Sequence, residues 1–362
     1  MKIAIKSFLE NLKSITNVVA DFIFIDCSTD DYAFYVSTDM MAIKIPLDVY
    51  DIKDDEKKVY VINKVEFMHL VTYVKDYIVL NSDYTYVSAD GQIKGKFEKN
   101  EGYEDDLESR KVLFDNENEY EEFMEVTPSI MTSITSGSIF VSSDSIKPSE
   151  RFMDIQNSKV FSYSNFKIYL NDIDVPKEGL FSNEIIKAIQ SLGVGTIVKS
   201  NKDSYFVTNA QKSIFEYFST PNDVDFHPLF AEGFQKKLNE TKTFNKIQFN
   251  IVELKNKLDY ISFYANKNPN NMCFLKMTQD GKFYISTDDN TFVEISAEVV
   301  KNEEFDEMSV PLDCSALQMI TSKVGHDCEV MNMYMSNDSS KKLITIVFGD
   351  TNETVILAKI NV

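Results

Sequence analysis

A short motif, a strand that leads into a capped amphipathic helix, recurs along the sequence at intervals of about 120 residues. In two of its copies the capping residue, Ser7 or Asn250, is followed three residues later by a glutamate, as in a capping box. A degenerate copy lies between them, where Thr127 precedes a proline suited to the first helical turn. A fold with this sequence must therefore accommodate the same strand and helix three times.

Each copy continues in the same order after its first helix. Alternating strands lead to a second capped helix and then to three strands separated by turn residues, with the second caps at Asn63, Ser182 and Asp313. The order β-α-β-β-β-α-β-β-β predicts an α+β protein of three repeated domains, 1–118, 119–240 and 241–362. The joins fall in acidic or polar stretches, residues 100–106 with 115–119, and residues 233–243, which we expect to be linkers.

Net charge and hydropathy restrict the functional classes. A formal net charge of -20 argues against a simple DNA-binding protein with an excess of lysine and arginine. Screening over about 8 Å at physiological salt nevertheless allows one face to be basic. No apolar run is long enough for a membrane span, and residues 1–6 alternate instead of forming a signal-peptide core. We therefore expect a cytoplasmic protein.

The cysteines and histidines give little support for a metal or catalytic site. Four cysteines are scattered without a CxxC pair, which favours buried free thiols over a disulfide framework or a zinc site. Among the three histidines, only His326 has a cysteine nearby, Cys328, and this spacing is weak support for a metal ligand or a nucleophile. The sequence predicts no cofactor and no metal.

With this pattern the chain resembles the bacterial-type DNA sliding clamp, the beta subunit of the replicative polymerase, or a phage-encoded relative of it. The resemblance covers the whole chain and rests on its length, the three-domain plan, residues 151–172 and the apolar closing segment 354–362. Two departures stand out. Residues 170–176 occupy the place of the family's Ala-Thr-Asp-Gly-His-Arg-Leu segment, and Lys359 replaces the family's proline near the end of the last strand.

The resemblance implies a non-enzymatic homodimer whose two chains close into a ring around duplex DNA. Twelve helices of about 10 Å set side by side would leave roughly 28 Å clear, enough for a hydrated duplex. The lining helices should carry lysines, whose mobile ammonium groups attract phosphates without gripping them. These DNA-facing candidates are Lys13, Lys75, Lys187, Lys255, Lys257 and Lys323, whereas the helix after Thr127 has no lysine. Edge strands within residues 77–96 and 249–286 are expected at the two ends of each chain's interface with the other.

The resemblance also implies an apolar groove between the second and third domains, in which short peptides of the polymerase and the clamp loader bind. By position, its residues would be Leu170, Ile173, Val175, Pro228, Ile356, Ala358 and Ile360.

Two other functional classes remain open on the sequence alone. An enzyme is conceivable because of the many carboxylates, but the acidic runs are typical of solvated loops, and no phosphate-binding loop or Ser/His/Asp set is recognisable. A structural or interaction protein of repeated β-rich domains would share the fold and differ in showing no retention on circular DNA and no stimulation of a polymerase.

Overall fold

The chain folds into two compact units, residues 1–131 with 184–223 and residues 132–183 with 224–362. The computed structural model describes residues 1–38, 40–100, 102–142, 144–147, 150–164, 167–201, 204–210, 214–219, 229–268, 271–287, 291–300, 307–324, 328–336, 338, 340–349, 351 and 353–359. The two units divide the middle repeat between them, so the three-domain boundaries stay a prediction.

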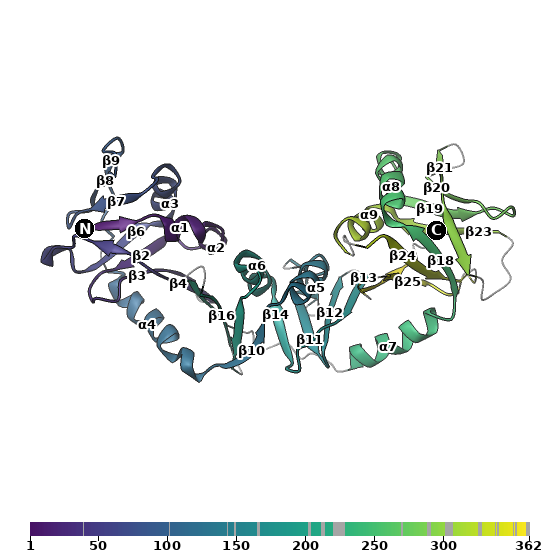
Figure 1. Cartoon of the computed structure of the whole chain (residues 1–362), viewed down its shortest axis with the longest axis horizontal. Helices are drawn as coiled ribbons and strands as arrows, with labels where there is room; N and C mark the ends of the chain where they lie inside the picture. Colours follow the sequence, from purple (N-terminus) through teal and green to yellow (C-terminus); the bar gives the residue numbers. More distant parts are fainter. Residues whose placement is uncertain are drawn as a thin grey trace. The chain divides into compact units, whose positions relative to one another are not determined.

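The first unit contains a five-stranded and an eight-stranded antiparallel sheet (Figure 1). The strands of the first sheet, in order, are β5 (Val49–Tyr50), β1 (Lys2–Ala4), β7 (Tyr77–Leu80), β8 (Thr85–Ser88) and β9 (Lys94–Lys96). The strands of the second, in order, are β10 (Glu121–Glu125), β15 (Ile197–Ser200), β16 (Ser204–Asn209), β17 (Ile214–Ser219), β4 (Met41–Pro46), β3 (Ala33–Ser37), β2 (Phe22–Asp26) and β6 (Val59–Asn63). The helices are α1 (Lys6–Glu10), α2 (Leu12–Asn17), α3 (Lys64–Tyr73), α4 (Glu104–Asp115) and α6 (Asn183–Leu192).

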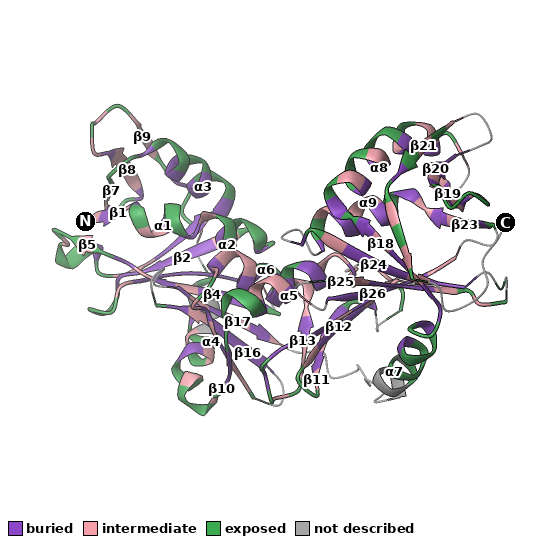
Figure 2. Cartoon of the chain, turned by 45° about the vertical axis from the view of Figure 1, so that its right-hand side comes forward, coloured by how far each residue is buried: buried purple, intermediate pink, exposed green. Residues whose placement is uncertain are grey.

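Helices cover both faces of the eight-stranded sheet. Phe8 of α1 and Phe67 of α3 pack on Phe34 of β3, with ring centroids 5.1 and 5.9 Å from that of Phe34. The next residue of β3, Tyr35, points to the opposite face and packs in one apolar cluster with Leu107 and other side chains of α4. The helices α1 to α3 therefore share one face, and α4 lies alone on the other (Figure 2).

The second unit contains a nine-stranded and a four-stranded sheet. The nine strands, in order, are β14 (Gly179–Ser182), β11 (Phe152–Gln156), β12 (Lys159–Ser164), β13 (Lys167–Asp172), β26 (Thr354–Ala358), β25 (Leu343–Phe348), β24 (Val330–Met335), β18 (Asn245–Asn250) and β22 (Ala297–Val300). The four strands are β21 (Phe292–Ile295), β20 (Phe283–Ser286), β19 (Met272–Met277) and β23 (Met308–Asp313). The helices are α5 (Pro128–Ser138), which begins in the first unit, α7 (Leu229–Thr241), α8 (Ile251–Ala265) and α9 (Cys314–Lys323).

The nine-stranded sheet is covered in the same way. The hydroxyl of Ser162 in β12 donates to the carbonyl oxygen of Gly137 in α5 at 2.8 Å, and a Cβ on Gly137 would lie 2.9 Å from Met153. Glycine therefore allows α5 to approach this face closely. On the opposite face, Leu238 of α7 joins a cluster with Phe161 and Ile168.

Three of the predicted capping residues are confirmed. Asn63, Asn250 and Asp313 each accept a hydrogen bond from the backbone N–H three residues on. The predicted cap at Ser7 is wrong, because the first helix begins at Lys6 and its N-cap, Ile5, makes no side-chain capping bond. This helix also breaks at Asn11 into the short α1 and α2.

Two further expectations need correction. The predicted order has three strands between the two helices of each copy, whereas the described residues form four in the second copy and five in the first and third. One of the strands missed in the first copy is β4, which pairs with β17. The predicted linkers overlap the helices α4 and α7, which extend beyond them. Leu107 of α4 and Leu238 of α7 are buried against the sheets, so tertiary packing stabilises helices in segments whose polar composition indicates loops.

Four-stranded blocks repeat within the two units. In the first unit β17, the last strand of one block, pairs with β4 of another, and in the second unit β26 pairs with β13 in the same way. The strands that are equivalent by order are β9, at the edge of the five-stranded sheet, and β21, at the edge of the four-stranded sheet. Within the described residues these two strands keep one open edge each.

Candidate functional site

In the first unit, the lysines predicted to face DNA lie on one side of the eight-stranded sheet. Lys13 lies on α2 and Lys187 on α6, and these helices are neighbours because the hydroxyls of Ser14 and Ser191 are 3.2 Å apart. Lys75 follows α3 by two residues. All three side chains are exposed and make no ion pair with the residues that the structure describes.

In the second unit, the predicted lysines lie on α8 and α9, which pack together. The side chain of Gln318 in α9 donates to Asp259 in α8 at 2.9 Å. Lys255 and Lys323 are exposed and Lys257 is half-buried, again without an ion pair in the described part of the chain. As predicted, α5 carries no lysine, and it carries no other charge.

The charge of these helices differs from that of the chain. The helices α1, α2, α3, α5, α6, α8 and α9 together contain seven lysines and five carboxylates, a small positive balance, although the whole chain carries -20. Several lysines elsewhere have acidic partners, for example Lys199 with Glu117 at 2.5 Å and Lys341 with Glu240 at 2.9 Å. Free ammonium groups are thus available on these helices in each unit, on the side of the large sheet opposite to α4 or α7.

The predicted groove residues are brought together only in part. Leu170 and Ile356 join an apolar cluster on the face that α7 covers, which we call the α7 face and define by its members: Phe161, Tyr163, Ile168, Leu170, Leu238, Leu343 and Ile356. Ala358 lies two residues after Ile356 and is half-buried. Ile173 and Val175 are buried outside this cluster, and Pro228 and Ile360 lie outside the described residues.

Sequence reasoning missed five members of the α7 face. Because side chains alternate along β12 and β13, Phe161, Tyr163 and Ile168 can be placed on the same face as Leu170 once the pairing of Phe161 with Leu170 is known. Leu238 is among them because the polar composition of residues 233–243 predicts a linker, whereas the segment forms part of α7.

Exposed apolar side chains accompany the open edges of β9 and β21. Beside β21, Phe292 and the α8 residues Tyr260 and Phe263 are 57%, 53% and 64% exposed. In the unit that holds β9, Val65 and Tyr73 of α3 are 75% and 64% exposed. Exposed aromatic residues of this kind are typical of protein interfaces.

The strands themselves differ in charge. The edge strand β9 exposes Lys94 and Lys96, and β21 exposes Glu294. Glu294 pairs with Tyr284 and alternates with the buried Ile295, so it points away from the core of its unit. The two edges are complementary in charge.

Metal and nucleophile chemistry gain no support from the described residues. They hold no group of three or more His, Cys, Asp and Glu side chains arranged for a metal, and His326 lies outside them. All four cysteines are free and buried, as predicted. Burial raises the pKa of Cys27 to about 12, so this thiol stays protonated and unreactive at neutral pH. Among the helices described, none is long and apolar enough to cross a membrane.

Comparison with known proteins supports the fold. No protein-family model and no curated protein matches the sequence. A putative DNA polymerase III beta subunit from Eubacterium rectale matches 100% of this chain and 100% of its own, with a TM-score of 0.73 and 12% identity. The DNA polymerase sliding clamp from Bacillus subtilis gives 0.73 and 12%, covering 100% of this chain and 98% of its own. The clamp from Pseudomonas aeruginosa gives 0.76 and 8%, covering 100% and 99%. The chain has the fold of these clamps from end to end, as the resemblance implied.

Proposed function

We propose that this chain is a DNA sliding clamp, a non-catalytic processivity factor whose two copies encircle duplex DNA and tether a replicative polymerase. The observation that carries the proposal is the end-to-end match to clamp structures, over 100% of the chain, combined with unpaired lysines on the helical side of each unit. A protein with this function acts inside the cell, where DNA is replicated.

Internal repetition supports closure of the ring by a second copy. The junctions β17 with β4 and β26 with β13 are equivalent, and the strands of the third equivalent pair, β9 and β21, do not pair with each other in the part of the chain that the structure describes. In a dimer, β9 of each copy would pair in antiparallel fashion with β21 of the other. This would form two further junctions of the same kind and would cover the open edges of β9 and β21. It would also bring Lys94 and Lys96 toward Glu294.

The helices support the same closure. Across the β17–β4 junction, α2 lies beside α6, that is, the first helical segment of one repeat beside the second helix of the next. The equivalent contact at the third junction joins α8 of one copy to α3 of the other. It would bury Tyr260, Phe263, Val65 and Tyr73, which a single chain leaves exposed.

Sliding requires attraction to phosphates without fixed contacts to bases. The six candidate lysines suit this task, because an ammonium group on a flexible stem makes transient phosphate contacts and none of the six is held by a carboxylate of the described chain. The acidic excess elsewhere in the chain repels DNA from other surfaces. The lysine-bearing helices are therefore proposed to line the path of the duplex.

Partner peptides are proposed to bind at the α7 face, in keeping with the groove that the resemblance implies. Leu170, Tyr163 and Leu343 of this face are only partly buried, so they leave apolar surface that a short peptide can cover.

The function is tested by retention on DNA. The protein is assembled on nicked circular plasmid with an active clamp loader, isolated by gel filtration, and compared with a sample in which the plasmid has been linearised. We expect retention on the circle and loss from the linear form. Equal behaviour on both would favour the alternative, a structural protein of repeated β-rich domains.

A further inference from the structure

A carboxylate lies within the sheet surface that carries the α7 face. Asp154 of β11 pairs with Phe161 of β12 on one side and with Leu180 of β14 on the other. Directly paired residues of an antiparallel sheet share a face, and Phe161 in turn pairs with Leu170. Asp154 therefore stands in one row with Leu180, Phe161 and Leu170, one strand away from the edge of the sheet.

The surroundings of Asp154 disfavour its charge. The side chain is half-buried and makes no hydrogen bond or ion pair with the residues that the structure describes. Burial, together with the negative charge of Glu178, raises the pKa of Asp154 to about 7. An ammonium group on the same face, that of Lys159, is already paired with Asp172.

Other buried carboxylates in this chain have partners. Glu353 accepts hydrogen bonds from the hydroxyls of Tyr169 at 2.7 Å and Thr351 at 3.0 Å. Burial would raise the pKa of Asp26, but Lys111 and Ser28 outweigh it and hold the pKa below its usual value. Asp154 differs from both, because it has no such partner among the described residues. A desolvated carboxylate without a partner costs free energy, so this site is unfavourable in the protein without a bound peptide.

We propose that the peptide bound at the α7 face places a lysine or arginine side chain against Asp154, with its apolar residues on the partly buried Leu170 and Tyr163. This inference rests on the proposed function, because it specifies the partner of the same peptide-binding face. The exposed Glu178, just before β14, adds a second negative charge at this end of the face.

The charge of the site selects this partner. A cation beside Asp154 would restore the interaction that the carboxylate lacks, and the surrounding apolar side chains would strengthen the attraction by excluding water. A peptide with an acidic residue at that point would instead meet Asp154 and Glu178 with like charge and be rejected. The site thus provides both affinity for a basic peptide and discrimination against an acidic one.

The test is a positional scan with fluorescent octapeptides that contain leucine and phenylalanine. Lysine or methionine is placed at each remaining position in turn, because these two side chains have similar length and differ in charge. Binding to the full-length protein is measured by fluorescence anisotropy for the wild type, for Asp154→Asn and for a control, Asp174→Asn. Asp174 is an exposed carboxylate a few residues beyond β13.

At one position of the scan, we expect the lysine peptide to bind the wild type and the control about tenfold more tightly than its methionine counterpart. Asp154→Asn should reduce this preference to less than twofold and leave binding of the methionine peptide intact. Equal binding of both peptides at every position of the scan would overturn the inference while leaving the peptide-binding face in place. If no peptide bound a protein that is retained on circular DNA, the proposed face itself would be wrong, and the inference with it.

Discussion

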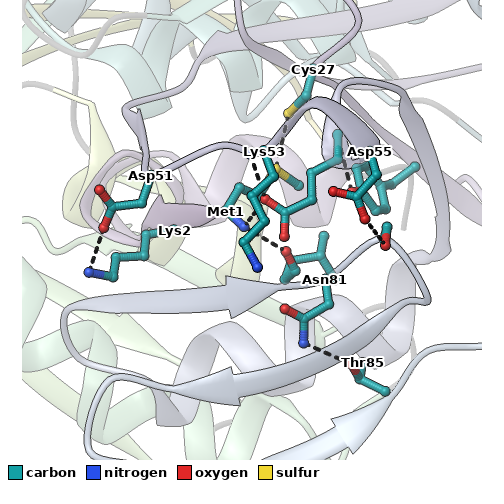
Figure 3. A network of polar contacts seen from close by, with 12 residues as sticks. Met1, Lys2, Cys27, Asp51, Lys53, Asp55, Asn81 and Thr85 are labelled. Atoms are coloured by element: carbon teal, nitrogen blue, oxygen red, sulfur yellow. Dashed lines mark hydrogen bonds and ion pairs between the residues drawn. The ribbon is translucent and has the colours of Figure 1, made fainter.

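At the residue scale, the strongest electrostatic feature is the pairing of buried charges, and Met1 provides the clearest case. Its ammonium group lies 2.5 Å from Glu56, and both side chains are nearly inaccessible to solvent. Glu56 also accepts a hydrogen bond from the backbone N–H of Lys53 at 3.0 Å. Figure 3 shows this network beside the exposed ion pair of Lys2 with Asp51. The two ion pairs differ in burial and provide a matched comparison.

Glu56→Gln should destabilise the protein by about 3 kcal/mol, because it leaves a buried ammonium group without its counter-ion. Asp51→Asn, which removes the exposed pair, should cause no measurable change. Urea denaturation of both variants provides the measurement. Equal stability of the two variants would show that burial does not govern the strength of these pairs.

Asp154 predicts a specific dependence of stability on pH. Its pKa is raised from 3.8 to about 7 in the folded chain, so between these values the folded state holds a proton that the unfolded state has lost. The contribution of this group to stability therefore falls as the pH rises from about 4 to 7. Asp154→Asn should stabilise the protein at pH 8 by about 2 kcal/mol after allowance for solvent screening, and by less at pH 5.5. Urea denaturation at the two pH values measures the effect, with Asp174→Asn as control. If the difference in unfolding free energy between Asp154→Asn and the wild type were the same at both pH values, the raised pKa of Asp154 would be contradicted.

At the scale of elements, helix capping separates the interpretations that the structure confirmed from the one that it corrected. Asn250 accepts a hydrogen bond from the backbone N–H of Glu253 at 3.0 Å. Ser7 has the same sequence signature, but its hydroxyl is buried and has no hydrogen-bond partner among the described residues. Asn250→Ala should therefore cost about 1 kcal/mol, whereas Ser7→Ala should cost nothing or stabilise slightly. Thermal unfolding of both variants gives the comparison, and a larger loss for Ser7→Ala would contradict it.

The order of strands and helices was largely predictable from alternation and caps, because these signals are local. The strand β4 and the helices α4 and α7 were missed, since their stability comes from contacts far along the chain. In the pairing of β4 with β17, for example, Met41 is opposite Phe218. The lysines of the candidate DNA-facing helices were predictable from helical spacing. Of the α7 face, only Leu170 and Ile356 were predictable, because its other members depend on strand register and on the position of α7.

At the scale of the whole molecule, a ring of two copies requires two identical interfaces between them. Phe263→Glu places a charge in the proposed contact of α8 with α3 and should weaken dimerisation at least 100-fold. Val112→Glu is the matched control, since Val112 is 54% exposed on α4, away from the proposed interface. Analytical ultracentrifugation over a range of concentrations should show a monomer for the first variant and the wild-type association state for the second. Unchanged association of Phe263→Glu would exclude α8 from the interface.

The most direct test of the central claim is covalent closure of the ring around DNA. Lys94→Cys and Glu294→Cys are combined in one chain, the protein is diluted until its copies separate, mixed with nicked circular plasmid, concentrated, and treated with a bifunctional thiol crosslinker. The account predicts a protein–DNA complex that survives denaturation with detergent and is released when the plasmid is cut once. Crosslinked dimers that separate from the intact circle in detergent would show that β9 and β21 do not close a ring around the duplex.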